Sequence, residues 1–455
     1  MSIDKYLARY AEPEALLAER VLGKHELAIV LPVLGESASA LSGLRGAVRE
    51  LPGRALVILV VNASELAPLE LRRANAALLD GFTRADQREL SPGVWSIVDP
   101  DFDLVVIDRS SPGRQLPPRE GVGLARKIGC DFALSLLHRG SLSSPWIFWA
   151  DADAALPRAH FEQARRALEA AGSWLPRGAT APGTAPKPAA LCFPFRHVSG
   201  EGDEVTRATL LHEVCLRYHV LSLAAAGSPY AHHSLGSALA VDAGAYAVVR
   251  GVPKRRAGED FYLLDKLAKV GSIARVRGEP VVIGARCSPR VPFGTGPRVE
   301  RILREGRALV ASPAAFRTLA MLLEGLDRVA RERRAAALEQ PLSALLPEER
   351  AAARHAIEVL ALNRGVKAAL ETSGSDLSRR LHTWFDALRT LRALHLMRDA
   401  GLAEVPISRA LVEGGFESDS DAEFDLERVL ERLRAREAEL FPLLGPALPR
   451  PSAPG

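Results

Sequence analysis

The stretch PWIFWADADAALP, residues 145–157, joins a run of apolar residues to two aspartates. A short run that is apolar at every position is typical of a central strand in a parallel sheet covered by helices. Asp151 and Asp153 follow at a spacing that points both side chains the same way in an extended chain. Ligands of open α/β sheets bind at the carboxyl ends of the strands. The stretch therefore predicts a strand that ends in a ligand-binding site.

Other segments along the chain support this sheet. Similar apolar runs lie at 27–34, 55–61 and 104–110, and stretches with helical spacing lie between the runs, at 37–50, 65–80 and 121–138. Further along, we expect a strand and a helix start in 236–249, a helix over 259–271, and a pair of strands in 274–286 with its turn at Gly278. Alternating strands and helices predict an α/β layer architecture.

The composition changes along the chain and suggests domain boundaries. Residues 25–297 form the predicted α/β domain, preceded by an N-terminal helical extension over residues 1–24. Residues 176–190 are rich in Pro, Ala and Gly without a period, which predicts a flexible insertion. Ala, Leu, Arg and Glu dominate residues 298–445, which we expect to be all-helical, and 446–455 is predicted to be a disordered tail.

The overall composition excludes several classes of protein. A chain of 455 residues with 47% hydrophobic and 25% charged residues is globular and long enough for two or three domains. The net charge of +4 comes without a basic block interleaved with aromatics, so no nucleic acid partner is expected. No apolar run approaches the roughly 20 residues of a membrane span. A charged N-terminus and four scattered cysteines, expected to be reduced, favour a cytoplasmic protein.

The two aspartates also predict a metal ion. Two neighbouring carboxylates repel, so a pKa rises unless a cation neutralises them. Mg²⁺ or Mn²⁺ suits the task, because both prefer oxygen ligands and bridge carboxylates to a diphosphate. The same D-x-D spacing occurs among Asp99, Asp101 and Asp103, and in the acidic stretch at 419–425, but not directly after an apolar strand. The plainer alternative for 151/153 is a strand-end turn with helix-capping aspartates.

The order of these motifs over residues 25–290 resembles the family 2-like glycosyltransferases of the GT-A fold. The matching positions are Pro32 and Glu36 in LPVLGES, Asn62 at the end of the second strand, Gly121, Arg126 and Gly129 in GVGLARKIG, the 151/153 pair, and Glu259 with Asp260. Three positions depart from the family pattern: Gly35 and Lys127 stand where asparagine is usual, and Asn62 stands where aspartate is commoner.

The resemblance implies an α/β fold of GT-A type, a mixed sheet flanked by helices, and it does not cover the helical C-terminal region expected from composition. It implies transfer of a sugar, a hexose above all, from a nucleotide-diphosphate sugar to a hydroxyl acceptor. Mg²⁺ or Mn²⁺ would bind Asp151 and Asp153, and the donor would contact Pro32, Glu36, Asn62, Arg126 and Asp151. Asp260 would be the general base of an inverting transfer, stabilised as a carboxylate at a helix N-terminus.

Further residues are candidates for binding the acceptor or a phosphate: Glu259, Arg256, Arg286 and Arg290. A solvated basic loop and a surface helix cap are the alternatives for this set. Two rival functions remain open. A nucleotidyltransferase would carry a glycine-rich basic loop after its first strand, and LPVLGESASALSG lacks the basic residue. A non-catalytic binding protein of the same fold is compatible with the departures at Gly35, Asn62 and Lys127.

Overall fold

The computed structural model describes residues 1–83, 87–170, 187–198, 202–285, 294–372, 376–417 and 425–440. The chain divides into two compact units. Unit 1 comprises Met1–Glu201 and Ser234–Pro297, and unit 2 comprises Gly202–His233 and Arg298–Gly455. Unit 1 contains the α/β layers, whereas unit 2 is almost entirely helical.

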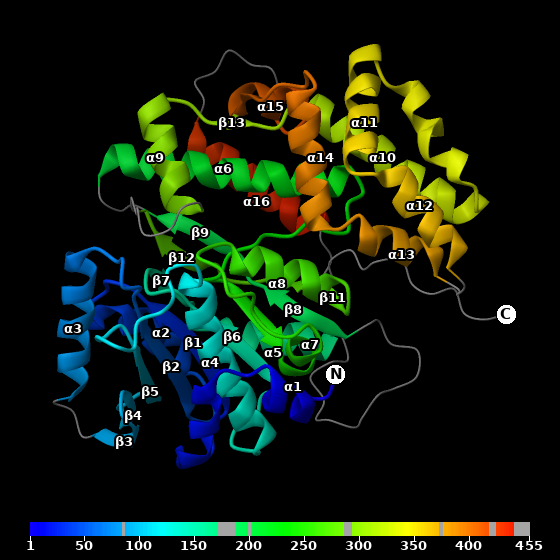
Figure 1. The fold of residues 1–455 in the computed structure, drawn as a ribbon. Helices are drawn as coiled ribbons and strands as arrows, with labels where there is room; N and C mark the ends of the chain where they lie inside the picture. Colours follow the sequence, from blue (N-terminus) through cyan, green and yellow to red (C-terminus); the bar gives the residue numbers. More distant parts are fainter. Residues whose placement is uncertain are drawn as a thin grey trace. The chain divides into compact units, whose positions relative to one another are not determined.

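Unit 1 is built on a nine-stranded mixed sheet with the order β11-β8-β10-β6-β1-β2-β5-β4-β3 (Figure 1). The strands are β1 (Leu27–Val33), β2 (Ala55–Asn62), β3 (Gln87–Ser91), β4 (Val94–Val98), β5 (Asp103–Arg109), β6 (Trp146–Trp149), β8 (Pro188–Cys192), β10 (Leu239–Asp242) and β11 (Ser272–Arg275). β1, β2, β5 and β6 run parallel, and β10 runs antiparallel to β6. Every residue of β1, β2 and β6 is buried, which explains their continuous apolar sequences.

Helices cover this sheet on the expected pattern. They are α1 (Ile3–Arg9), η1 (Pro13–Arg20), η2 (Ala38–Leu41), α2 (Ser42–Val48), α3 (Leu69–Thr83), α4 (Gly121–His138), α5 (His160–Ala170), α7 (Ala243–Val248) and α8 (Glu259–Ala268). α4 packs against β1, β2 and β6. It approaches closely because Gly129 lacks a side chain: a Cβ there would lie 2.5 Å from Val30 Cγ1. Gly129 is thus a packing residue.

A second, three-stranded sheet has the order β7-β12-β9, with β7 (Ala154–Ala155), β9 (Phe195–Val198) and β12 (Val281–Gly284). β7 begins directly after Asp153, so this sheet borders the predicted site. The strand pair expected in 274–286 is wrong: β11 pairs with β8, and β12 pairs with β7 and β9. The turn at Gly278, with φ of 141°, carries the chain from one sheet to the other instead of closing a hairpin.

The strand order reverses next to β1. The chain goes from β1 to β2 to β5 on one side of β1, and then places β6 on the other side. The ladder with β6 ends at Val30 and Trp149, whereas the ladder with β2 continues to Val33 and Val61. A crevice at such a reversal, outside the carboxyl ends of the strands, is where open α/β sheets bind ligands. Pro32 lies where β1 has a strand on one side only, which a residue without an N–H tolerates.

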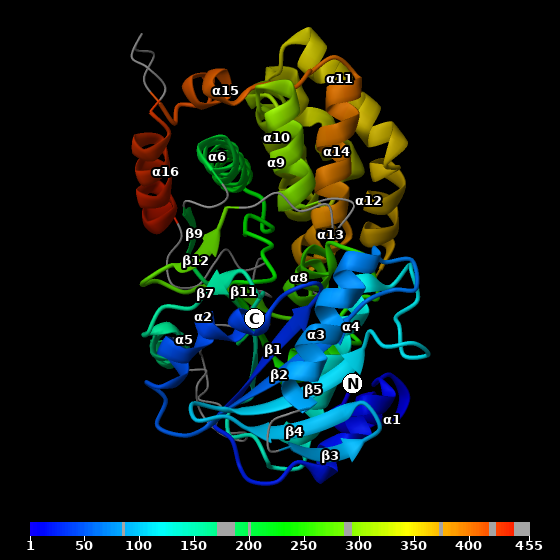
Figure 2. The same cartoon turned by 90° about the vertical axis from the view of Figure 1, so that its left-hand side faces the viewer.

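Unit 2 consists of helices around α6 (Asp203–Ala225). The others are α9 (Thr295–Glu305), α10 (Pro313–Glu332), η3 (Ala335–Ala344), α11 (Pro347–Val359), α12 (Leu362–Glu371), α13 (Leu377–Trp384), α14 (Ala387–Asp399), α15 (Ile407–Glu413) and α16 (Leu426–Leu440). α10, α11 and α14 run side by side in Figure 2 and pack against one another. α6 packs against α10, α15 and α16.

The domain limits differ from the sequence-based ones first at α6. Unit 1 ends at Pro297, but α6, expected within 25–297, groups with the C-terminal helices. Buried ion pairs account for this grouping: Glu213 on α6 lies 2.7 Å from Arg434 on α16, and Arg217 lies 2.7 Å from Glu437. The expectation of helices alone beyond residue 298 is also wrong. β13 (Leu309–Val310) pairs with β14 (Val405–Pro406), two strands too short to show a period of two.

The termini and the insertion also need correction. Residues 1–24 are not a separate extension, because α1 and η1 belong to unit 1 and pack on α4. The insertion predicted at 176–190 overlaps β8, whose first residues are Pro188, Ala189 and Ala190. Residues 176–186 and the tail 446–455 lie outside the described residues.

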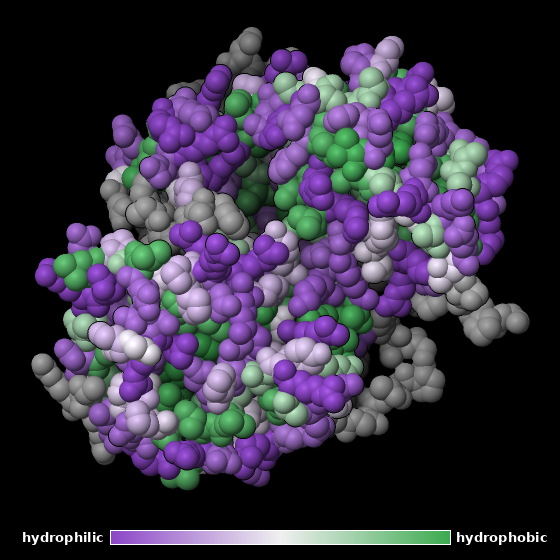
Figure 3. Space-filling view, viewed as in Figure 1, coloured by the Kyte–Doolittle hydropathy of each residue, from purple (hydrophilic) through white to green (hydrophobic). Residues whose placement is uncertain are grey.

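The arginine-rich helices of unit 2 have acidic neighbours along their own length. Arg301 lies 2.8 Å from Glu305, and Arg328 lies 3.0 Å from Glu324. In Figure 3 the helices of unit 2 present a largely hydrophilic surface with small apolar patches. Among the described residues, no helix combines the length and the apolar character needed to cross a membrane.

Candidate functional site

Arg126 joins the two acidic motifs that the sequence singled out. Its guanidinium lies 2.6 Å from Asp151 Oδ1 and 3.1 Å from Glu259 Oε1. Asp151 follows β6, and Glu259 opens α8, so residues 108 positions apart meet on one buried cation. Two charged hydrogen bonds in a buried setting fix the separation of the two acidic groups. Arg126 therefore links the two acidic motifs, and its contact with the donor stays a prediction.

The surroundings of Arg126 hold its guanidinium in one place. The side chain is 2% exposed and lies 4.5 Å from the centre of the Trp149 ring at the end of β6. Gly236 packs beside it: a Cβ at this position would come within 2.6 Å of Arg126 Nη2. The guanidinium therefore lies between the face of the Trp149 ring and the backbone of Gly236, which fix its orientation.

The start of α8 places two carboxyl groups side by side. Gly258 precedes the helix with φ of 70°, in the left-handed region that glycine tolerates. Glu259 is buried and turns toward Arg126, while Asp260 is half-buried and accepts a hydrogen bond of 2.7 Å from its neighbour, Phe261 N. The sequence-based prediction that Asp260 opens a helix after a glycine is confirmed.

Burial and like charge alter the acid–base properties of this cluster. Burial, followed by repulsion from Glu259, raises the pKa of Asp260 to about 7. Burial also raises the pKa of Glu259, although Arg126 opposes the shift. Asp151 and Glu259 thus share one guanidinium, and Asp260, beside Glu259, has a pKa near neutral pH. A carboxyl group with a pKa near the working pH is suited to general acid–base chemistry.

The loop before α8 is held from two sides. Cβ atoms at Gly121 and Gly123 would collide with the backbone of residues 253–256, at distances down to 2.9 and 2.5 Å respectively, so these glycines let α4 begin against this loop. On the other side, Glu12 from the N-terminal segment lies 2.8 Å from Lys254 and 3.3 Å from Lys127. The loop that presents Glu259 and Asp260 is therefore packed between α4 and the N-terminal segment.

Lys127, a departure from the family pattern, has a structural role. It is buried, and its ammonium group donates to Tyr6 Oη at 3.1 Å and to the Tyr10 carbonyl at 2.6 Å, and also contacts Asp131. Tyr6 and Tyr246 both donate to Asp131, at 2.6 and 2.7 Å. The lysine thus anchors the N-terminal helix to α4.

Asn62 supports the carboxyl ends of β1 and β2, and its contact with the donor stays a prediction. It is 5% exposed, and its amide donates to the backbone carbonyls of Val33 at 2.9 Å and Val60 at 3.2 Å. Asn75 on α3 extends the network: its amide donates to Asn62 O at 3.0 Å, and its oxygen accepts from Gly35 N at 2.7 Å. Sequence reasoning missed Asn75, because one asparagine within a helix carries no distinguishing pattern.

Glu36 lies at a pocket beside this network. The pocket has a volume of about 400 Å³ and is lined by Gly35, Glu36, Ser37, Ala74, Ala77, Leu78, Gly81 and Phe82. Its walls come from the loop after β1 and from α3. Glu36 is therefore at a concave surface, as expected of a donor-binding residue. Pro32, by contrast, is buried within β1.

The acidic pair fits a divalent cation that also binds a diphosphate. Asp151 is 35% exposed and keeps one carboxylate oxygen beyond the one paired with Arg126, while Asp153 is half-buried in the segment leading to β7. In the described part of the chain, no group of three His, Cys, Asp or Glu side chains could hold a metal ion by itself. Mg²⁺-type sites need no such cage, because one or two carboxylates suffice when phosphates and waters supply the other ligands.

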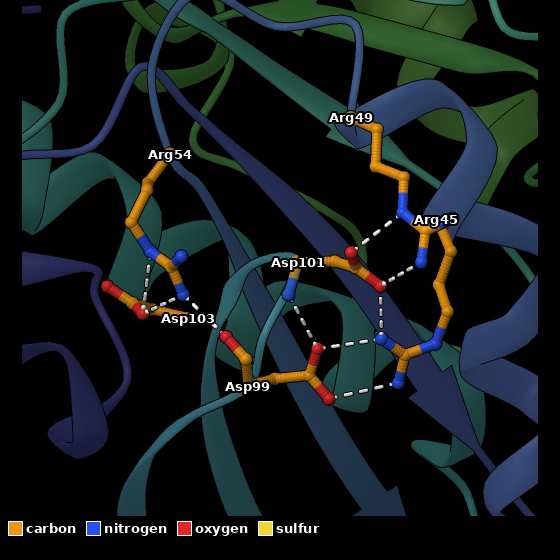
Figure 4. Close-up of polar contacts among 6 residues, drawn as sticks. All are labelled: Arg45, Arg49, Arg54, Asp99, Asp101 and Asp103. Atoms are coloured by element: carbon orange, nitrogen blue, oxygen red, sulfur yellow. Dashed lines mark hydrogen bonds and ion pairs between the residues drawn. The ribbon is translucent and has the colours of Figure 1, made fainter.

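The other D-x-D run has a different environment. Asp99, Asp101 and Asp103 precede or begin β5, at the amino ends of the strands, and Arg45, Arg49 and Arg54 surround them (Figure 4). Arg45 lies 2.6 Å from Asp101, and Arg54 lies 2.6 Å from Asp103. Matched opposite charges make this a structural cluster, so the 151/153 pair stays the candidate for metal binding.

The remaining candidates are partly placed. Arg256 is exposed on the loop before α8, whereas Arg286 and Arg290 lie outside the described residues. His233, in the loop before β10, lies 2.8 Å from Glu437 within unit 2. Sequence reasoning also missed Trp149 and Gly236, whose roles depend on contacts between distant segments.

Comparisons with known proteins complete this description. No protein-family model matches the sequence, and no curated protein matches it. A solved structure that matches is the mannosyltransferase PcManGT from Pyrobaculum calidifontis in complex with GDP-Man and Mn²⁺. It is 14% identical, with 96% of this chain and 97% of that chain covered and a TM-score of 0.31. A likeness at this TM-score carries no argument, so the function proposed for this chain rests on its own residues.

Proposed function

We propose that the protein is a metal-dependent glycosyltransferase of GT-A type, which transfers a sugar from a nucleotide-diphosphate sugar to a hydroxyl acceptor with inversion. One observation carries the proposal: Asp151 and Glu259 meet on Arg126 at the strand-order reversal, and Asp260, next to Glu259, has a pKa raised to about 7. The parallel core of β1, β2, β5 and β6, with a small second sheet starting after Asp153, supports a GT-A fold.

The proposed roles follow from this arrangement. Mg²⁺ or Mn²⁺, when bound at Asp151 and Asp153, supplies the positive charge that stabilises the departing diphosphate. The oxygen of the acceptor hydroxyl bonds to the anomeric carbon, and the bond from that carbon to the diphosphate breaks. Asp260 accepts the proton that the hydroxyl loses. Arg126 keeps the metal-binding and proton-accepting segments at a fixed distance. Glu36 contacts the nucleoside from the pocket beside β1.

A nucleotide screen tests this proposal. Thermal shifts with UDP-, GDP- and ADP-sugars should show one donor class that stabilises the protein with Mn²⁺ and loses its effect with EDTA. The same donor should be hydrolysed slowly, with release of the nucleoside diphosphate. Stabilisation by a nucleoside triphosphate with release of pyrophosphate would instead identify a nucleotidyltransferase. Binding of a donor without any turnover would identify a non-catalytic binding protein.

A further inference from the structure

The basic loop Lys254, Arg255 and Arg256 lies just before the two acidic residues of α8, yet its arginines do not pair with them. Glu259 pairs with Arg126 instead, at 3.1 Å. Lys254 is engaged by Glu12 at 2.8 Å. Arg255 and Arg256 are exposed and have no ion-pair partner among the described residues. Elsewhere in unit 1, by contrast, Arg45, Arg49 and Arg54 are all neutralised by aspartates.

The backbone of both arginines and the guanidinium of Arg255 are held by neighbouring residues. Arg255 stacks on Tyr262 of α8, with 3.8 Å between the guanidinium carbon and the ring centre. The Arg255 carbonyl accepts a hydrogen bond of 2.9 Å from Gly123 N, and the Arg256 backbone packs against Gly121. Pre-organised guanidiniums lose little entropy on binding, and their planar donors match phosphate and carboxylate groups.

The loop is also close to the proposed reaction centre. Arg256 and Asp260 are four positions apart, so their Cα atoms lie within roughly 14 Å of each other even in a fully extended chain. A small acceptor can span such a distance with its hydroxyl at Asp260 and a charged group at the loop. In the proposed reaction the metal and the donor diphosphate bind at Asp151, which pairs with Arg126.

From this arrangement we infer that Arg255 and Arg256 bind an anionic group, a phosphate or a carboxylate, on the sugar acceptor. The inference rests on the proposed glycosyl transfer and narrows its acceptor to small anionic hydroxyl compounds. The reaction itself is unchanged: the acceptor hydroxyl loses its proton to Asp260, and the anionic group stays bound to the guanidiniums throughout.

Three acceptors of similar ring shape test the inference: glucose, glucose 6-phosphate and glucuronate. With the donor identified by the nucleotide screen, transfer to at least one charged acceptor should exceed transfer to glucose. The variant Arg255→Gln/Arg256→Gln should raise KM for that acceptor roughly tenfold to a hundredfold, since it removes charge-assisted hydrogen bonds. Donor hydrolysis should be unchanged. The preferred acceptor, glucose 6-phosphate or glucuronate, tells whether phosphate or carboxylate is recognised.

Arg73→Gln is the matched control, because Arg73 is exposed on α3 and should not affect the acceptor KM. Equal transfer to glucose, or an unchanged acceptor KM in the double variant, would overturn the inference while leaving the glycosyltransferase proposal intact. Absence of donor hydrolysis in the unaltered protein would overturn the proposed function. In that case calorimetry with inorganic phosphate still decides: equal binding to unaltered and double-variant protein rejects the anion site, and weakened binding supports it.

Discussion

Asp260 combines a half-buried position at a helix start with a pKa of about 7. If it is the general base, Asp260→Asn should lower turnover by roughly 10²–10⁴-fold. Donor affinity should stay the same, because the group acts on the acceptor proton. The rate of the unaltered enzyme should rise with pH up to about 7 and then level off, as the carboxylate form accumulates. Steady-state kinetics over pH 5–9 measure the turnover, the donor affinity and the pH dependence. NMR of the product's anomeric configuration shows whether the transfer inverts.

Asp265→Asn, a change further along α8, is the control and should keep near-normal turnover. Near-normal turnover in Asp260→Asn, or a product that retains the donor's configuration, would show that Asp260 is a helix cap or an acceptor anchor.

The same carboxyl group affects folding. Its folded pKa of about 7 exceeds the unfolded value of about 3.9, so the folded state holds more protons between these pH values. Stability should therefore fall as pH rises from about 4 to about 7. The side chain of Asp260→Asn cannot ionise, so the variant should have a higher Tm than the unaltered protein at pH 8 but not at pH 4. Each kcal/mol of added stability corresponds to roughly 2–4 °C in Tm. Thermal unfolding in metal-free buffer measures the difference. An equal difference at both pH values would contradict the raised pKa.

Arg126 should matter for stability as well as for activity. Arg126→Met leaves the buried Glu259 without its counter-charge, and loss of one partner from a buried ion pair costs about 3–5 kcal/mol. Arg126→Lys keeps the charge but not the forked geometry, so it should be more stable than Arg126→Met and still impair turnover. Denaturant unfolding and donor hydrolysis check these outcomes. Equal stability of the methionine variant and the unaltered protein would show that Arg126 does not hold the cluster together.

The acidic residues of the candidate site were predictable from the sequence. The pairing of Arg126 with two of them was not. Asp151 and Asp260 stand beside an apolar run and at a helix start, which are local signals. The contact of Arg126 with Asp151 and Glu259 depends on residues 25 and 133 positions away. The hydrogen bonds of Asn62 were unpredictable for the same reason, because nothing in the sequence shows which carbonyls a side chain at a strand end contacts.

At the scale of elements, the two ends of the parallel strands have different electrostatics. The amino ends carry the balanced cluster of Arg45, Arg49 and Arg54 with Asp99, Asp101 and Asp103. The carboxyl ends carry more acidic than basic groups, around Arg126. This contrast separates a stabilising cluster from the one proposed to bind a cation.

The amino-end cluster should stabilise the fold in a pH-dependent way. Hydrogen bonds from Arg49 and Arg45 lower the pKa of Asp101 to about 2, below its unfolded value of about 3.9. Its contribution is present above pH 4 and is lost as pH falls toward 2. Asp101→Asn should therefore be less stable than the unaltered protein at pH 7 and approach it at pH 2. Denaturant unfolding at both pH values tests this, and equal stability at pH 7 would show that the ion pairs contribute nothing.

Elements with strong periodicity were predictable. The ranges of α4 and β1 agree closely with the sequence-based ones, because α4 has five turns of helical spacing and β1 is wholly buried. β3, β4 and β7 were missed, since edge strands and two-residue strands carry little apolar signal. β8 was hidden in part by the Pro- and Ala-rich segment before it.

At the scale of the whole molecule, the end of the α/β unit at Pro297 could be read from the change in composition. The grouping of α6 with the C-terminal helices of unit 2 could not be predicted from the sequence. This helix lies between strands in the sequence, and its buried Glu213 and Arg217 find their partners about 220 residues later on α16. Charged residues buried within a helix give no sign in the sequence of which segment neutralises them.

The proposed function depends above all on Asp151 and Asp153 binding the donor diphosphate through a divalent ion. Calorimetry of the donor with and without Mn²⁺ tests it most directly, on the unaltered protein, Asp153→Asn and Asp101→Asn. Asp153→Asn should lose most of the Mn²⁺-dependent gain in affinity, because an uncharged amide is a poor ligand for a hard cation. Asp101→Asn, from the other D-x-D run, should keep it. An unchanged Mn²⁺-dependent affinity in folded Asp153→Asn would contradict the account.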